Sequence, residues 1–205
     1  MNLHRQTCLF MEPSRCRISK SSTEVRNSDV TLHLYEIALD PADSTDATRL
    51  LKEIDGRVHR DGGELIEAQV TREARRIFVI AEFQGEAPRL DSDALRVDSV
   101  SGPHSVRLVG ADLGQLKSVR PVAGYLVEWD LPADLDMQTY LARKKAKAPK
   151  YADVPEVSFL RTYVREDMDK CLCFYDAPDE EAVLRARKAV DTPVDRLHGL
   201  GDISL

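Results

Sequence analysis

Apolar residues recur along the chain at two spacings, one typical of strands and one typical of helices. Alternation runs over residues 32–39, and a helical period follows it. The apolar face of that helix comprises Ala47, Leu50, Leu51, Ile54 and Val58. Ser44 or Thr45 can cap the helix, because a short hydroxyl side chain accepts a hydrogen bond from a free amide of the first turn. The glycines at residues 62–63 can end it.

The remaining elements form a first set and then an equivalent second set. After the first helix we expect strands over residues 65–70 and 76–83, a short helix over 92–95 and a strand over 105–109. The second set comprises a strand over 125–131, a helix over 136–148, hairpin strands over 157–164 and 170–175, a helix over 178–190 and a strand over 195–200. Each set has the order βαββαβ, which is typical of the ferredoxin-like fold.

Direct comparison of the two sets indicates a tandem duplication. Three segments align at nearly constant spacing: residues 34–39 with 126–131, residues 70–73 with 164–167, and residues 78–83 with 171–176. A ferredoxin-like sheet carries helices on one face only, so two small units gain buried apolar area by covering each other's open faces. The sequence therefore predicts an α+β protein whose two tandem ferredoxin-like units pack as an intrachain pseudo-dimer resembling an α/β barrel.

The predicted organisation has four segments. Residues 1–29 are polar and have no apolar period, which is typical of a disordered tail. Residues 30–112 form a degenerate first repeat, residues 113–123 a linker, and residues 124–205 the second repeat.

Composition narrows the classes of function. The net charge of −6 argues against nucleic-acid binding, which needs a concentrated basic surface. No run approaches the roughly 18 apolar residues of a membrane span, and the N-terminus lacks the apolar core of a secretion signal. The 4 cysteines do not form the pattern of a disulfide framework. We therefore expect a protein of the reducing cytoplasm, with no nucleic-acid or membrane partner.

Strand alternation sorts the second half into two faces. The residues assigned to the face covered by helices are Val127, Trp129, Leu160, Val164, Leu172 and Phe174. The residues assigned to the opposite face, which would line the space between the two sheets, are Glu128, Phe159, Arg161, Tyr163, Cys171, Cys173 and Tyr175. A carboxylate, a guanidinium, phenols and thiols are an unusual set for a plain core, so these side chains are candidates for a ligand site.

Each candidate also has a structural interpretation. Glu128 and Arg161 could form an ion pair between strands, because a buried charge needs a partner. Tyr163 and Tyr175 could pack with hydrogen-bonded hydroxyl groups. Glu36 repeats Glu128 in the first half, as a ligand or as a second ion pair.

Metal binding is a further possibility for the second half. Thiolates suit soft metals such as nickel, zinc or copper, and Cys171 and Cys173 are two residues apart. Asp176 and His198 could complete such a site. The alternative is that the two cysteines are small buried hydrophobes.

The second half resembles a known family through several short segments. These are Val127-Glu128, Leu131-Pro132, Thr162-Tyr163-Val164, Cys173 to Asp179, Glu181-Ala182-Val183 and Pro193 to Arg196. The resemblance is to a small ferredoxin-like family, catalogued as a domain of unknown function, whose characterised members are described as nickel-binding. Ala133 and Asp176 stand where that family usually has glycine and glutamate. The resemblance implies a dimeric α/β barrel, made here within one chain, and binding of nickel or another transition metal.

Three hypotheses of function follow. The first is a non-enzymatic cytoplasmic protein that holds a transition metal or a small molecule between its sheets, as a monomeric pseudo-dimer or a homo-oligomer. The second is a cofactor-independent α/β-barrel oxygenase or isomerase for a small hydrophobic metabolite, with Glu128 as base and Arg161 or Tyr163 stabilising an oxyanion. Such an enzyme needs a roomy apolar cavity. The third is an interaction module with an inert interior.

Overall fold

The computed structural model describes residues 30–40, 46–119 and 122–201. The predicted tail over residues 1–29 and the predicted caps Ser44 and Thr45 lie outside these ranges. Within them, the α+β class is confirmed, and the predicted elements form in the predicted order.

The first half contains four strands and two helices among its described residues. These are β1 (Val30–Ala38), α1 (Ala47–Arg60), β2 (Glu64–Val70), β3 (Arg76–Gln84), α2 (Ser92–Leu95) and β4 (Ser99–Val109). Asp46 caps α1, accepting a hydrogen bond of 2.9 Å from the amide of Thr48. A helix that the sequence did not predict, α3 (Leu113–Val119), occupies much of the predicted linker.

The second half repeats this order and adds one short helix. Its elements are β5 (Tyr125–Asp130), α4 (Met137–Lys147), the 3₁₀ helix η1 (Ala148–Asp153), β6 (Ser158–Arg165), β7 (Lys170–Asp176), α5 (Glu180–Ala189) and β8 (Arg196–Gly199). Asp136 and Asp179 cap α4 and α5, each accepting a hydrogen bond of 2.7 Å from an amide of the first turn. Pro178 therefore lies before the cap of α5 and not in its first turn.

The eight strands of the described residues form one sheet in the order β2-β3-β1-β4-β6-β7-β5-β8. The strands are antiparallel, and within each half the order of the four strands is the same. Pairing of β4 with β6 joins the halves at one edge. At the other edge, Thr71 bridges Leu200, and the amide of Gly201 donates to the carbonyl of Val70 at 2.8 Å. The outermost strands, β2 and β8, are thus joined through the residues that follow them.

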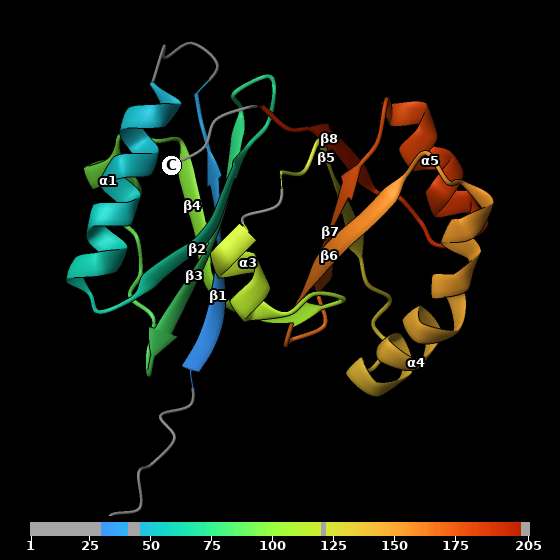
Figure 1. The fold of residues 1–205 in the computed structure, drawn as a ribbon. Coiled ribbons are helices and arrows are strands. Elements are labelled where there is room, and N and C mark those ends of the chain that lie inside the picture. The colour runs from blue at the N-terminus through green and yellow to red at the C-terminus, as the bar shows by residue number, and fades with distance from the viewer. Residues whose placement is uncertain (1–29, 41–45, 120–121, 202–205) are drawn as a thin grey trace, which may run out of the picture.

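The two halves of the sheet face each other, with α1 outside the first and α4 and α5 outside the second (Figure 1). Three apolar clusters fill this arrangement. The first outer core lies between α1 and the first half, and the second outer core lies between α4, α5 and the second half. The central core lies between the halves, and its fully buried members include Leu34, Phe78, Leu126, Tyr163, Leu172 and Phe174.

The pairing of β7 with β6 shows that five residues of β7 lie on the opposite face of the sheet from the one predicted. Tyr163 pairs with Leu172, and Val164 pairs with Cys171. Residues directly opposite each other share a face of the sheet. The residues that the pairing moves to the central core are Leu172 and Phe174. The residues that it moves to the second outer core, under the helices, are Cys171, Cys173 and Tyr175. The predicted face was wrong because a slip of one residue reverses every side chain on a strand.

The predicted faces of Phe159 and Leu160 were also wrong, because β6 contains a bulge. The register shifts between Phe159 and Arg161, so these two side chains do not share a face despite their spacing. Phe159 packs in the second outer core, whereas Leu160 packs against the central core. Alternation alone could not locate this extra residue.

Candidate functional site

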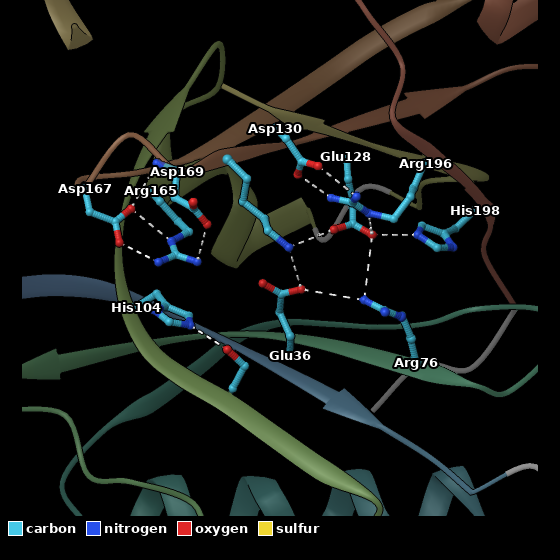
Figure 2. A network of polar contacts seen from close by, with 12 residues as sticks. Glu36, Arg76, His104, Glu128, Asp130, Arg165, Asp167, Asp169, Arg196 and His198 are labelled. Atoms are coloured by element: carbon cyan, nitrogen blue, oxygen red, sulfur yellow. Dashed lines mark hydrogen bonds and ion pairs between the residues drawn. The ribbon is translucent and has the colours of Figure 1, made fainter. Parts of the chain in front are cut away.

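Glu128 lies at the centre of a buried ionic network between the halves (Figure 2). Its side chain is 0% exposed and comes from β5. Nε2 of His198 lies 2.7 Å and Nε of Arg196 lies 3.0 Å from Oε1, and Nζ of Lys170 lies 3.0 Å from Oε2. Burial raises the pKa of Glu128, but hydrogen bonds from His198, Arg196 and Lys170 outweigh it and hold the pKa well below its usual range. Glu128 is therefore ionised in the folded protein.

The first half contributes a second carboxylate to the same network. Oε2 of Glu36 lies 3.1 Å from Nζ of Lys170, so that one ammonium group connects Glu36 and Glu128. Nη1 of Arg76 lies 3.9 Å from Glu36 and 4.0 Å from Glu128. The glutamates thus share their cations across the boundary between the halves, as Figure 2 shows.

A second buried cluster lies on the same side of the sheet. Glu67 of β2 accepts hydrogen bonds of 2.8 Å from Nε of Arg161 and from the hydroxyl of Tyr163, and it also accepts one from Nη2 of Arg161. The Arg161 guanidinium stacks over the ring of Phe174 at 4.7 Å. These contacts join β2 of the first half to β6 of the second, so the partner of Arg161 is Glu67 and not Glu128.

The thiol groups lie on the other face of the second half, beneath α4 and α5. Sγ of Cys173 lies 3.9 Å from Sγ of Cys171 and accepts hydrogen bonds from Oγ1 of Thr162 at 3.3 Å and Nη1 of Arg187 at 3.5 Å. The hydrogen bond from Cys171, reinforced by Lys144 and Arg187, lowers the pKa of Cys173 well below its usual range. The same thiol contact and burial raise the pKa of Cys171. Cys173 is therefore the more acidic of the two thiols.

A pocket of about 340 Å³ opens beside this thiol pair, between α4, η1 and α5. Its walls are formed by Trp129, Tyr140, Arg143, Lys144, Lys147, Ala148, Tyr151, Arg187, Val190, Asp191, Thr192 and Pro193. We call it the helix-side pocket. Its lining combines aromatic rings with four cationic side chains, a composition suited to a small ligand with an apolar body and a negative group.

The candidate residues of the sequence analysis therefore separate into four places. Glu128 contacts His198 in the ionic network, whereas Arg161 contacts Tyr163 through Glu67. Cys171, Cys173 and Tyr175 are buried under the helices. Asp176 is exposed at the end of β7. The predicted lining residues do not form a single site between the sheets.

The donor set does not fit a nickel site among residues 30–40, 46–119 and 122–201. No group of three histidine, cysteine, aspartate or glutamate side chains in these ranges could hold a metal ion. Cys171 and Cys173 face the second outer core, away from His198. Glu128 is already contacted by three cationic or donor side chains, and the Lys170 ammonium holds the position between Glu36 and Glu128. A divalent ion there would lie against these positive charges.

Several residues of these sites were not singled out from the sequence. Arg187 is 3% exposed and belongs to the buried face of α5 with Ala182, Val183 and Ala186. Their helical spacing is a signal that could have identified Arg187. Glu67, Lys170 and Arg196 are charged residues on strands, and only the strand order shows which carboxylate each one meets.

Comparison with known proteins supports part of this description. Residues 125–199 match the family model described as nickel responsive protein SCO4226-like, which confirms the resemblance for that part of the chain. No curated protein matches the chain at a significant level.

Two solved structures are similar in fold. One, assigned as a chlorite dismutase, has a TM-score of 0.50 and 13% identity, over 84% of this chain and 95% of that chain. The other, assigned as a monooxygenase of Fusobacterium nucleatum subsp. nucleatum, has a TM-score of 0.44 and 10% identity, over 83% of this chain and 91% of that chain. At this identity the first likeness shows the fold alone. No helix within the described ranges is long and apolar enough to cross a membrane.

Proposed function

We propose that this protein is a non-enzymatic binding protein whose small ligand occupies the helix-side pocket of the second half. The observation that carries this proposal is the pocket itself, a cavity of about 340 Å³ bordered by a buried arginine and three aromatic rings. Its volume lies within the range of small-molecule sites, roughly 300–1,000 Å³. The pocket also lies within the part of the chain that matches the nickel responsive family.

The space between the halves acts as a scaffold in this proposal. Tyr163, Leu172 and Phe174 are at most 1% exposed and fill the central core. Glu128 is paired with Lys170 of the neighbouring strand β7, and Glu67 is paired with Arg161 of β6 in the other half. An oxygenase or isomerase site there would need a roomy apolar cavity, and a general base would need a pKa near the working pH. Both requirements argue against the enzymatic hypothesis.

A second candidate is a metal-related role, which the family match over residues 125–199 favours. Dialysis of untagged protein against nickel, followed by elemental analysis, tests it. Stoichiometric nickel that is lost in both Glu128→Gln and His198→Ala would support a metal site in the ionic network. Metal-free wild-type protein would reject that site.

We also propose that the two halves are tandem ferredoxin-like repeats packed as an intrachain pseudo-dimer of the α/β-barrel type. Their strand orders are the same, and Glu36 and Glu128 occupy matching positions: Glu36 lies opposite Phe78 on β3, and Glu128 lies opposite Leu172 on β7. The pairing matches Phe78 with Leu172, whereas the alignment of the two sequences matched it with Cys171, one residue earlier. Bonds at both edges of the sheet support a closed arrangement. We place this protein in the cytoplasm because of its cysteine usage.

A ligand-capture experiment with a filled pocket tests the proposed function. Untagged protein is analysed by native mass spectrometry and by a thermal-shift screen of small metabolites. Thr192→Phe places a ring among the pocket-lining residues, whereas Gln138→Phe places the same ring on α4 outside the lining. We expect ligands that stabilise wild type and Gln138→Phe but not Thr192→Phe. Ligands that stabilise all three proteins alike, or none of them, would contradict the pocket assignment.

A further inference from the structure

The helix-side pocket has an excess of positive charge. Four of its lining side chains are cationic, Arg143, Lys144, Lys147 and Arg187, and one is a carboxylate, Asp191. That carboxylate is 85% exposed at the rim, where Nζ of Lys147 lies 3.1 Å from it. The inner wall of the pocket therefore carries positive charge without a carboxylate to balance it.

Arg187 is the most deeply buried of these cations. Its Nη1 donates to Sγ of Cys173 and to the hydroxyl of Tyr175 at 3.3 Å, and its Nη2 donates to the carbonyl of Pro193. Nε is buried and has no partner within the part of the chain that the structure describes. The acceptors of Arg187 are a thiol, a phenol and a backbone carbonyl, and its Nε has none, so an anion in the adjacent pocket would stabilise this buried guanidinium.

Lys144 provides a second cation on the same wall. Its Nζ donates to Oγ1 of Thr162 at 2.9 Å and lies 4.1 Å from the ring centroid of Phe159. Across the described ranges, no carboxylate lies within ion-pair distance of Lys144. Because an ammonium group has three donor positions, Lys144 retains donors for a ligand.

The apolar walls favour a flat ligand. The rings of Trp129 and Tyr140 lie 6.0 Å apart with an interplanar angle of 36°, and both border the pocket. Tyr151 borders it as well and stacks on Phe159 at 5.4 Å. Aromatic walls contact planar rings over a large area and gain stacking energy beyond burial.

We propose that the helix-side pocket binds a small aromatic carboxylic acid, with its carboxylate toward Lys144 and Arg187 and its ring among Trp129, Tyr140 and Tyr151. This inference rests on the proposed function, which requires only that the pocket hold some small ligand. A charge-assisted hydrogen bond is roughly twice as strong as a neutral one, so the charged group decides affinity. The neutral amide of the same acid should bind much more weakly.

The chain has 1 tryptophan, Trp129, and it borders the pocket. Its fluorescence therefore reports binding at this place directly. Full-length protein is titrated with benzoate and with benzamide, which has the same ring and no charge. The variants are Lys144→Gln and, as the matched control, Lys145→Gln, because Lys145 is exposed on the same helix and is not part of the lining. All proteins are first compared by circular dichroism and urea unfolding.

We expect benzoate to change Trp129 fluorescence saturably and to bind at least about tenfold more tightly than benzamide. Lys144→Gln should weaken benzoate binding by about tenfold and leave benzamide binding unchanged, and Lys145→Gln should match wild type. Equal affinity for benzoate and benzamide, or an equal loss of benzoate affinity in Lys144→Gln and Lys145→Gln, would contradict an aromatic carboxylic acid as the ligand. The proposed function would not be affected by either result. If neither probe binds and the metabolite screen also gives no ligand for wild type, both proposals fail.

Discussion

The two halves share one backbone plan, yet their helix-covered faces differ in chemistry. In the first half, Ile77, Val79 and Ala81 of β3 lie against α1 in an apolar core. In the second half, the corresponding residues of β7 lie under α4 and α5 and are Cys171, Cys173 and Tyr175. The first face is closed by leucine and isoleucine side chains of α1, whereas the second leaves the helix-side pocket, which has aromatic walls and cationic side chains. This difference is the reason that we propose a ligand site in the second half, with the first half as its support.

The two faces that lie between the halves are more alike in chemistry than the two helix-covered faces. Glu36 of β1 and Glu128 of β5 occupy corresponding positions, and both contact Lys170. His104 and His198 also correspond, because they pair with Leu34 and Leu126 respectively. His198 contacts Glu128, but His104 contacts Oγ of Ser101 at 2.7 Å. Both halves therefore contribute side chains to the ionic network, and the second half contributes more of its close contacts.

The largest expected effect is a loss in the free energy of unfolding, and it should differ between Glu128 and Glu36 of the ionic network. Glu128→Gln leaves Lys170 and Arg196 near a buried neutral amide, and loss of one partner of a buried ion pair costs about 3–5 kcal/mol. Glu36 is 10% exposed and has fewer close cations, so Glu36→Gln should cost about 1 kcal/mol. Urea unfolding of both variants measures the two losses. Equal losses in the free energy of unfolding would contradict a larger contribution from Glu128 of the second half.

A smaller effect compares a buried tyrosine from each half. Tyr163 donates to the Glu67 carboxylate at 2.8 Å, whereas Tyr35 donates to the carbonyl of Pro88 at 2.7 Å. A hydrogen bond to a charged group contributes about 1.5–3 kcal/mol, and a neutral one contributes about 1 kcal/mol. Tyr163→Phe should therefore lower the free energy of unfolding by about 2 kcal/mol, and Tyr35→Phe by about half as much. The reverse order in urea unfolding would contradict the assignment of Glu67 as a charged acceptor.

Acid should lower the free energy of unfolding through protonation of Glu128 in the ionic network. Its pKa is depressed in the folded protein, so its contribution to stability is present above the ordinary glutamate pKa of about 4.3 and is lost as the pH falls toward the folded value. The free energy of unfolding of wild type should fall by about 1 kcal/mol between about pH 7 and pH 4 from this group alone. Glu128→Gln should show a shallower decline. Parallel pH profiles for the two proteins would contradict the depressed pKa.

The smallest effect is spectroscopic and distinguishes the two thiols of the second half. Cys173 has a lowered pKa and Cys171 a raised one, so Cys173 should ionise at a lower pH than Cys171. In a background with Cys8→Ser and Cys16→Ser, the ultraviolet thiolate absorbance should appear at a lower pH in Cys171→Ser, which retains Cys173, than in Cys173→Ser. An absorbance that appears first in Cys173→Ser would contradict this order.

Much of the fold could be predicted from the sequence, because apolar periodicity is a local signal. Most strands and the long helices lie within a few residues of their predicted bounds, but β4 begins at Ser99 and not at residue 105. Glu128, Arg161 and Tyr163 lie on their predicted face. The site was predicted less well. The positions of Cys171, Cys173 and Tyr175 depend on the register of one hairpin, and a slip of one residue reversed them. Partners such as Glu67 for Arg161 depend on strands that are far apart in the sequence.

Amide chemical-shift mapping with benzoate tests the central claim, that the ligand site lies under the helices of the second half and not between the sheets. Isotopically labelled protein is titrated, and the amides and the Trp129 indole are followed by NMR. We predict perturbations confined to α4, η1, α5, residues 190–193, the Trp129 indole of β5 and the adjoining face of β7, with little change in the first half. Perturbations centred on the residues of the central core, such as Phe78, Tyr163 and Phe174, would contradict it.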